Sequence, residues 1–343
     1  MYWEPEKQLL GEKSPQFYPL VRAQNVLLVT TGRTRRAKIV PPIVTKSLAD
    51  LNAMDSGSRA TPLWLTAEDV ALQLTPTDEA SRANLSSASK DYVEALSVEA
   101  PVLFWHACAA LYSPGYRHEN ASAIHHDWPR IPLPATRDAL LASAELGRTV
   151  AALLDVEEPV DAVTTGSVRR ELRPLGVLTA VSGGQLDPSA GDLAVTAGWG
   201  HGGKGGVTMP GRGRTVERPY TDAELAAFRE GLSDLSLTYD QLTASLGGAC
   251  YDVYLSDVAY WRCVPARAWK YTIGGYQVMK KWLSYRERAL LGRDLKPDEA
   301  RYVQEMTRRI AAILLLEPAL DANYERVKAD TYQWEREGAD HGA

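Results

Sequence analysis

The stretch from Trp261 to Ala289 constrains the fold of this 343-residue chain most. It places three tryptophans and three tyrosines among seven Lys and Arg residues, around the glycine pair Gly274–Gly275. The spacing of Met279, Trp282, Leu283 and Leu290 predicts an amphipathic helix that packs one face on a core. A strand and a glycine break precede this helix. On this interpretation the basic residues form a solvated face.

The same stretch allows a second interpretation, in which it contacts nucleic acid. Glycine permits a close approach of the backbone to a ligand. Lys and Arg neutralise phosphates, and aromatic rings stack on bases or wedge between them. Composition alone favours the helix-and-core interpretation, because aromatic residues at helical spacing usually belong to a core.

Composition limits the class of protein. Hydrophobic residues make up 45% and charged residues 24% of the chain, as in globular proteins of one large or two medium domains. A net charge of −5 excludes indiscriminate polyanion binding, so a nucleic-acid contact requires local basic patches. Three cysteines without paired or metal-ligand spacing favour a reducing compartment. We find no signal peptide and no apolar run long enough for a membrane span, and we expect a cytoplasmic chain without a metal site.

The residue pattern predicts an α+β fold, a mixed strand-and-helix domain with a β-rich middle and a helical C-terminal part. We divide the chain into a β-rich N-terminal part (1–65), a flexible connector (66–90), a helical part with a Pro-rich connection (91–158), a β-rich insert with a Gly-rich hairpin (159–220) and a helical C-terminal part (221–335).

Apolar spacing also predicts individual elements. Thr221 and Glu224 fit a capping box at the start of a helix, and His106 lies on an apolar helix face, which is typical of a core histidine. A last helix is expected to begin near Pro297 and to end at Pro318, because proline breaks helices. The other expected elements are helices over 91–112, 136–155 and, in two pieces, 222–247, and strands over 177–181, 192–197 and 206–209.

The segment from Gly198 to Gly206 has features of nucleotide-binding loops. It satisfies G-x-G-x-x-G and contains Lys204 after a glycine, but Gly205 stands where a phosphate-binding loop needs Ser or Thr. No helix pattern follows, so we expect a flexible hairpin loop. Basic residues make it a candidate finger over a phosphate backbone: Lys204, Arg212, Arg214 and Arg218.

Several blocks of the chain have a recognisable order. Residues 269–283 read W-K-Y-T-I-G-G-Y-Q-V-M-K-K-W-L, residues 111–117 read L-Y-S-P-G-Y-R, and residues 127–134 read D-W-P-R-I-P-L-P. Residues 2–5, 257–261 and 320–324 complete the set. Together they resemble the C-terminal specificity (target-recognition) domain of type ISP restriction–modification enzymes and of fused N6-adenine DNA methyltransferases. The family has Phe where this chain has Trp128.

The resemblance implies a DNA-recognition module of a bacterial phage-defence enzyme that also contains nuclease, helicase and adenine methyltransferase domains. The family's glycine-rich S-adenosylmethionine loop and N-P-P-Y tetrapeptide are missing, since Pro41–Pro42 lies between Val40 and Ile43. We therefore expect no catalytic residue and no cofactor in this chain, and S-adenosylmethionine in the partner methyltransferase domain. The abrupt start at residues 2–5 suggests an excised piece or a split subunit.

On this interpretation the chain reads double-stranded DNA in the major groove while a partner domain flips the adenine. This hypothesis needs Gly274–Lys281 and the turn near Arg35 to share one basic cleft. The candidate DNA-binding residues are basic or aromatic: Arg33, Arg35, Arg36, Lys46, Lys204, Arg212, Lys270, Tyr271, Lys280 and Lys281. Two alternatives remain, a non-DNA-binding scaffold that docks onto the methyltransferase or helicase, and a nucleotide-dependent enzyme that uses the glycine loop.

Overall fold

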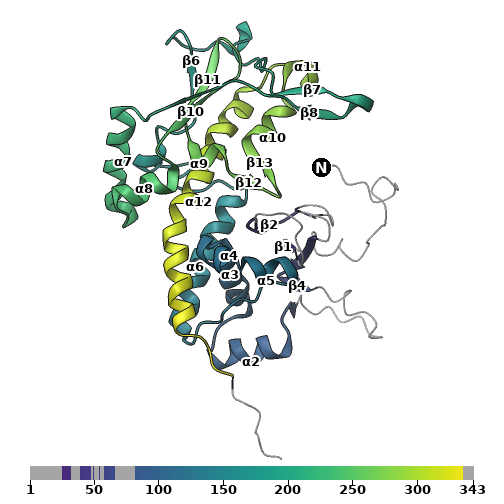
Figure 1. The fold of residues 1–343 in the computed structure, drawn as a ribbon, viewed down its shortest axis with the longest axis vertical. Helices are drawn as coiled ribbons and strands as arrows, with labels where there is room; N and C mark the ends of the chain where they lie inside the picture. Colours follow the sequence, from purple (N-terminus) through teal and green to yellow (C-terminus); the bar gives the residue numbers. More distant parts are fainter. Residues whose placement is uncertain are drawn as a thin grey trace, which may run out of the picture. The chain divides into compact units, whose positions relative to one another are not determined.

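The computed structural model describes residues 25–31, 39–47, 49, 54, 58–65 and 82–334. The chain forms two compact units (Figure 1). Unit 1 comprises Met1–Leu111, Arg117–Ala151 and Glu325–Ala343, and unit 2 comprises Tyr112–Tyr116 and Ala152–Tyr324. Helices and small antiparallel sheets alternate along the chain, which confirms the α+β prediction. The five-segment division stays a prediction.

The strands of unit 1 form two small sheets. β1 (Leu27–Thr31) lies between β2 (Ile43–Thr45) and β3 (Ser58–Pro62), antiparallel to both. β4 (Trp64–Leu65) pairs with β5 (Arg82–Ala83). The described end of the predicted connector thus contains β5 and the first residues of the next helix.

The helical part begins with α2 (Ser87–Ala95) and α3 (Ala100–Tyr112), where the sequence predicted one helix over 91–112. The break occurs because Ser97 adopts a φ of +51°, which a continuous helix cannot accommodate. The helices that follow are α4 (Pro114–Glu119), α5 (Ala121–His126) and α6 (Arg137–Leu154).

His106 on α3 is a core histidine, as predicted. Its Nδ1 lies 2.7 Å from Ser143 Oγ and its Nε2 lies 2.9 Å from the Pro132 carbonyl oxygen. Burial lowers the pKa of His106 to about 4, against the weaker opposing effect of the Pro132 hydrogen bond. The imidazole is therefore neutral at physiological pH.

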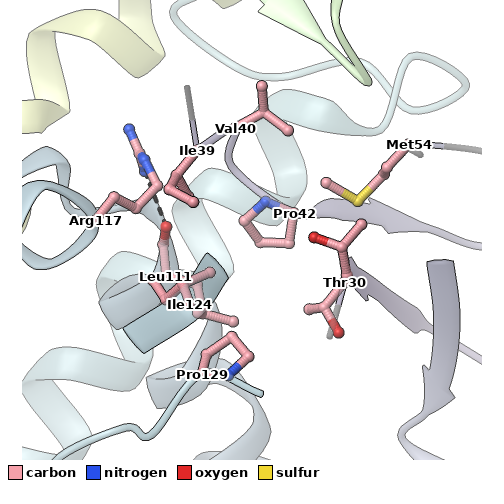
Figure 2. A pocket seen from close by; sticks show the side chains of 10 residues that line it. Thr30, Ile39, Val40, Pro42, Met54, Leu111, Arg117, Ile124 and Pro129 are labelled. Carbon is pink, nitrogen blue, oxygen red and sulfur yellow. Dashed lines mark hydrogen bonds between the residues drawn. The ribbon is translucent and has the colours of Figure 1, made fainter. Parts of the chain in front are cut away.

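A small pocket of unit 1 lies between its strands and helices (Figure 2). Thr30, Pro42, Met54 and Ile124 line it, together with Arg117, whose Nη1 donates to the Leu111 carbonyl oxygen over 2.9 Å. Its volume of about 20 Å³ has room for about one water molecule. We assign no ligand to it.

The main sheet of unit 2 has four antiparallel strands. Their order is β6 (Val177–Ala180), β11 (Ala259–Pro265), β10 (Cys250–Tyr254) and β9 (Thr215–Arg218). The predicted strand over 192–197 is wrong. Its apolar residues reach the core from a loop, held where Thr196 and Ala197 both donate their N–H groups to the Leu255 carbonyl oxygen.

Two helices follow β9. They are α7 (Asp222–Leu235) and α8 (Tyr239–Leu246), so the two-piece helix over 222–247 is confirmed. The predicted capping box is present, because Thr221 accepts from the Glu224 N–H and Glu224 accepts from the Thr221 N–H. α8 has the same kind of box.

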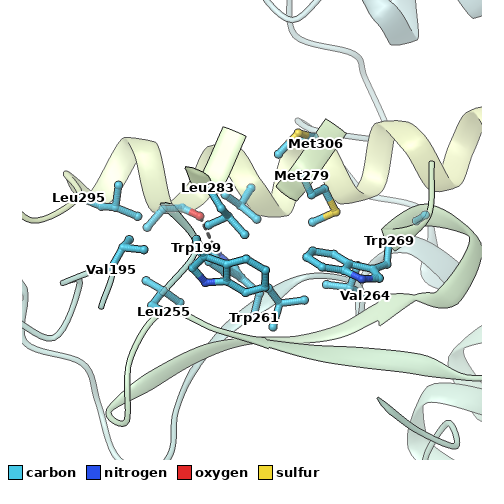
Figure 3. Packing of buried hydrophobic residues seen from close by; sticks show 14 of the residues in the cluster. Val195, Trp199, Leu255, Trp261, Val264, Trp269, Met279, Leu283, Leu295 and Met306 are labelled. Atoms are coloured by element: carbon cyan, nitrogen blue, oxygen red, sulfur yellow. Dashed lines mark hydrogen bonds between the residues drawn. The ribbon is translucent and has the colours of Figure 1, made fainter. Parts of the chain in front are cut away.

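Tryptophans fill the core of unit 2 (Figure 3). Trp199 and Trp261 are fully buried, and each indole N–H has an acceptor, the carbonyl oxygens of Tyr254 (2.8 Å) and Ala300 (3.0 Å). Trp269 packs edge-on against Trp199 with ring centroids 5.5 Å apart. Satisfied indole N–H groups remove the cost of burying them.

The last helix, α12 (Pro297–Ala329), does not end at Pro318, so that prediction was wrong. Proline removes one helical hydrogen bond. Leu314 and Leu315 before it and Leu320 and Tyr324 after it are all buried, so packing holds the helix together on both sides.

Within the described ranges, no single helix has the length and apolarity to cross a membrane. The helices α2 and α3 taken together, bent by 101°, satisfy the length and composition expected of a membrane span.

Candidate nucleic-acid interface

The glycine pair of the stretch 261–289 forms a two-residue hairpin turn. β12 (Thr272–Ile273) pairs with β13 (Tyr276–Gln277) across it. Gly274 and Gly275 have φ of +55° and +79°, as a type I′ turn requires at both central positions. α10 (Val278–Ser284) begins directly after β13 and buries Met279 and Leu283 completely. The helix-and-core interpretation is confirmed for Met279 and Leu283, whereas Leu290 lies on a separate short helix.

Exposed side chains border α10 on its other side. Tyr276 is 58% and Tyr285 45% exposed. The Lys281 Nζ lies 4.7 Å from the Tyr276 ring centroid and 4.8 Å from that of Tyr285. Cation–π contacts of this kind contribute about 0.5–1 kcal/mol each at exposed sites. They hold the lysine charge between two exposed rings.

The glycine-rich segment is a hairpin, as predicted. β7 (Gly200–Gly202) pairs with β8 (Thr208–Pro210), and the 3-10 turn η5 (Lys204–Gly206) forms its tip. The hairpin contacts α10 and α11 (Arg288–Leu291). A Cβ at Gly200 would lie only 2.0 Å from the Ser284 carbonyl oxygen, so glycine is needed for the strand to lie on the end of α10.

A buried carboxylate anchors the base of the hairpin. Glu287, which is 7% exposed, accepts from the Gly198 N–H (3.2 Å) and the Trp199 N–H (2.7 Å). The next residue, Arg288, donates its N–H to the Val195 carbonyl oxygen over 2.7 Å. Sequence reasoning missed Glu287, whose only local signal is that it is the one acid in the stretch 261–289.

The β7–β8 hairpin and α10 come from two stretches without acidic residues. Residues 193–216 contain no Asp or Glu, and neither do residues 258–286. Within them Arg214 pairs with Asp257 (2.5 Å) and Arg267 with Glu317 (2.6 Å). The remaining cations of the two stretches are Lys204, Arg212, Arg262, Lys270, Lys280, Lys281 and Arg286. These two stretches are thus positively charged although the whole chain has a net charge of −5.

Four of the predicted DNA-binding residues lie on or next to two elements that contact each other, the β7–β8 hairpin and α10. Lys204 is exposed at the hairpin tip, Arg212 is exposed just beyond β8, and Lys280 and Lys281 lie on α10, which the hairpin contacts. We define the hairpin–α10 surface as these four residues with Tyr276 and Tyr285.

The other predicted residues lie elsewhere. Lys270 is exposed after α9 (Ala266–Trp269), with its Nζ 6.0 Å from the Tyr251 ring. Tyr271 packs partly buried against the core, and Lys46 is exposed after β2 in unit 1. Arg33, Arg35 and Arg36 lie outside the described residues, and so does the turn near Arg35 that was expected to share a cleft with Gly274–Lys281.

Arg218, expected in the basic finger, is instead part of an ion cluster. Its Nη1 and Nη2 donate to the two Glu224 oxygens, and its Nε donates to Asp252 Oδ2, each over 2.9 Å. Both carboxylates are almost wholly buried, with 4% and 12% of their side chains exposed. Arg218 therefore neutralises internal charge and is not available to a phosphate.

Two cysteines lie beside this cluster. Ligand atoms of Glu224, Cys250 and Cys263 lie within 4.8 Å of one another, a proximity that the sequence spacing did not indicate. A hydrogen bond to Cys250 and then burial raise the pKa of the Cys263 thiol, and Arg218 already occupies the carboxylate. We interpret the group as part of the packing and assign no metal to it.

Two of the sequence blocks contact each other within unit 2. Asp321 Oδ1 accepts from Ser113 Oγ (2.6 Å) and from the Gly115 N–H (2.8 Å). The rings of Tyr116 and Tyr324 pack edge-on, 5.4 Å apart. An open cavity of about 290 Å³ is lined by Asp321, Arg267 and Glu317 among others. Because these three side chains already bond within the protein, they do not indicate a ligand.

The fold resembles that of a solved DNA-bound protein. Among solved structures, the chain is similar to the cryoEM structure of a DrdV–DNA complex, with a TM-score of 0.52 and 17% identity over 90% of this chain and 25% of that one. It is also similar to a nuclease-deletion mutant of the Type ISP restriction–modification enzyme LlaGI in complex with a DNA substrate mimic, with a TM-score of 0.48 and 15% identity over 93% of this chain and 22% of that one.

This chain therefore spans about a quarter of the length of each of these two solved proteins. A search of curated proteins found no match. The sequence profile of the Type ISP C-terminal specificity domain matches residues 1–312, which is most of the chain. The chain belongs to the Type ISP C-terminal specificity domain family.

Proposed function

We propose that this chain recognises a DNA sequence for a Type ISP restriction–modification enzyme, and that it binds the duplex through the hairpin–α10 surface. The observation that carries the proposal is the contact between two acid-free, cation-bearing stretches, the hairpin and α10, in a chain whose net charge is −5. Family membership supports it, and so does the similarity in fold to DrdV, whose structure was solved with DNA.

The chemistry of this surface suits a phosphate backbone. Lys204, Arg212 and Lys280 supply charges that displace the counterions of DNA. Lys281 is held between two rings, so less side-chain freedom is lost when it meets a phosphate. Contacts of this kind set the position of a protein on the duplex but do not read its sequence.

The chemical steps belong, in this proposal, to other domains. An adenine methyltransferase domain would bind S-adenosylmethionine and modify the base, and helicase and nuclease domains would act in restriction. The present chain would hold the duplex in register for them, in the cytoplasm. None of the residues described above is given a catalytic role.

The test is the salt dependence of duplex binding by the full 343-residue chain. Each phosphate contact contributes about −0.9 to the slope of log K against log salt concentration. Lys281→Gln should make that slope shallower by about 0.9, and Lys280→Gln/Lys281→Gln by about twice as much. Fluorescence anisotropy of a labelled duplex measures both.

Lys90→Gln is the matched control, because Lys90 is an exposed lysine on α2. This variant should bind like the unmodified chain. If the unmodified chain does not bind duplex DNA, or binds it with an affinity independent of salt, the proposal fails. A scaffold that does not touch DNA predicts that all of these variants leave DNA affinity unchanged.

A further inference from the structure

The β7–β8 hairpin has two unlike faces, and this difference bears on how DNA sequence is read. Side chains alternate between the faces of a strand. Gly200 and Gly202 share one face, where Cβ atoms would lie 3.1 Å and 3.9 Å from the Leu290 methyl groups. This face is turned toward α11, and its two glycines leave it without side chains on β7.

The opposite face carries larger side chains and is turned to solvent. His201 is opposite Met209 in the ladder, and Val207 lies two residues before Met209, so all three share this face. Val207 is 60% and Met209 45% exposed, and His201 is exposed as well. We call His201, Val207 and Met209 the ribbon face.

Met209 lies along the hairpin. A Cβ at Gly203 would be 2.6 Å from Met209 Cγ, so the methionine side chain crosses the position that a residue larger than glycine would occupy. Figure 1 shows the hairpin beside α10 with its tip extending away from the main sheet of unit 2. The ribbon face is thus an apolar strip on a projecting two-stranded element.

The charges around this strip point to its partner. Lys204 and Arg212 lie at either end of the segment that contains Val207 and Met209, and no acidic residue occurs from 193 to 216. A protein partner with an apolar face would not require a segment that has basic residues and no acidic ones. A DNA groove presents phosphates at its edges and, in the major groove, base edges and thymine methyl groups on its floor. A two-stranded ribbon fits the major groove.

We propose that the ribbon face enters the major groove and determines part of the sequence preference of this chain. Val207 and Met209 would pack against C5-methyl groups of thymine, and His201 would hydrogen-bond a base edge. Lys204, Arg212, Lys280 and Lys281 would hold the flanking phosphates. This inference rests on the proposed function, since it assigns base reading to one part of the same surface.

The experiment uses the full chain and duplexes selected from a randomised pool. The preferred sequence of the unmodified chain is compared with those of Val207→Ala/Met209→Ala and His201→Ala. We expect the preference to relax at a few adjacent positions in each variant, with the salt slope unchanged. Lys281→Gln is the contrasting control. Because Lys281 is proposed to contact a phosphate, this variant should have a shallower salt slope and keep the preferred sequence.

A chemical probe then tests the methyl contacts directly. Deoxyuridine replaces thymidine at single preferred positions, which removes only the C5-methyl group. The unmodified chain should lose about four-fold in affinity per contacted methyl, the value of one buried CH₃ group. Val207→Ala/Met209→Ala should no longer distinguish the two bases. Because both residues are exposed, these variants should keep the thermal midpoint of the unmodified chain.

The outcomes separate this inference from the proposed function. If the unmodified chain binds no duplex, the proposed function fails and this inference fails with it. If the chain binds duplexes but prefers no sequence, or if the ribbon variants keep the same preference and the same response to deoxyuridine, this inference alone is overturned. Fluorescence of 2-aminopurine that rises on binding would indicate insertion between base pairs and would also overturn it.

Discussion

Gly200→Ala should detach the hairpin from α10 and so link the packing of this surface to its function. The added Cβ would lie 2.0 Å from the Ser284 carbonyl oxygen and 3.1 Å from Leu290 Cδ1. Ordinary contact begins at 3.4 Å, so the strand must move by about 1.4 Å. Backbone atoms are involved on both sides, so neither can give way by changing a rotamer.

The expected magnitude follows from this overlap. Forcing extra carbon into a packed site costs about 1–3 kcal/mol. Replacing glycine by alanine returns about 0.4–1 kcal/mol by restricting the unfolded chain. Gly202→Ala should restrict the unfolded chain in the same way without the steric overlap, because its Cβ would lie 3.9 Å from Leu290 Cδ2. The two variants should therefore differ by about 1–3 kcal/mol, or roughly 3–10 °C in the midpoint of unfolding.

Calorimetry of both variants measures this difference. Gly200→Ala should also bind duplex DNA more weakly than Gly202→Ala, since it shifts the hairpin that carries Lys204 relative to α10. Equal midpoints and equal affinities for the two variants would refute the reasoning, because the clash at Gly200 would then have no consequence.

Two further predictions concern buried charge. Since burial lowers the pKa of His106 to about 4, the unfolded chain takes up a proton first as the pH falls below about 6.5. The native state should thus lose up to about 3 kcal/mol between pH 6.5 and 4. His106→Gln should abolish this loss, so its stability relative to the unmodified chain, measured by urea unfolding, should improve as the pH falls; a constant difference contradicts the argument. Arg218→Met should cost about 3–5 kcal/mol because it leaves Glu224 and Asp252 unpaired, whereas Arg148→Met, at an exposed pair with Glu145, should cost under about 1 kcal/mol in the same assay. If both variants lost the same free energy of unfolding, the buried pairing of Arg218 with Glu224 and Asp252 would contribute no more than an exposed ion pair.

The sequence predicted best where local rules suffice. Gly274–Gly275 implies a break because few other residues take positive φ twice in succession, and the structure has a two-residue turn there. The spacing of Met279 and Leu283 indicates a buried face, since 3.6-residue periodicity is a property of the helix itself. Thr221 and Glu224 likewise form a capping box between residues three apart.

Predictions failed where distant packing overrides a local preference. Pro318 signals a helix end, yet buried residues on both sides carry α12 through it. The segment 192–197 has the composition of a strand, but its hydrogen bonds go to Leu255 and its side chains reach the core from a loop. In both places the sequence pattern correctly reports burial and only the backbone conformation differs.

The candidate site was predictable as residue types but not as an arrangement. The sequence indicates Lys204, Arg212, Lys280 and Lys281 as basic side chains that could contact phosphates. The hairpin and α10 meet where Glu287 bonds Gly198 across 89 residues of sequence. No periodicity encodes a pair of that separation. The prediction for Arg218 was wrong in the opposite way. The sequence places this basic residue near the hairpin, but in the structure it neutralises the buried carboxylates of Glu224 and Asp252.

The position of α10 couples the core of unit 2 to the surface that we assign to DNA. A helix of seven residues is not stable alone in water, so its place is set by the burial of Met279 and Leu283 and by the hairpins that contact it. Lys281 stands on the same short helix. A change that shifts the core beneath α10 should therefore also move Lys281, so the position of this proposed phosphate contact depends on the core as well as on the surface.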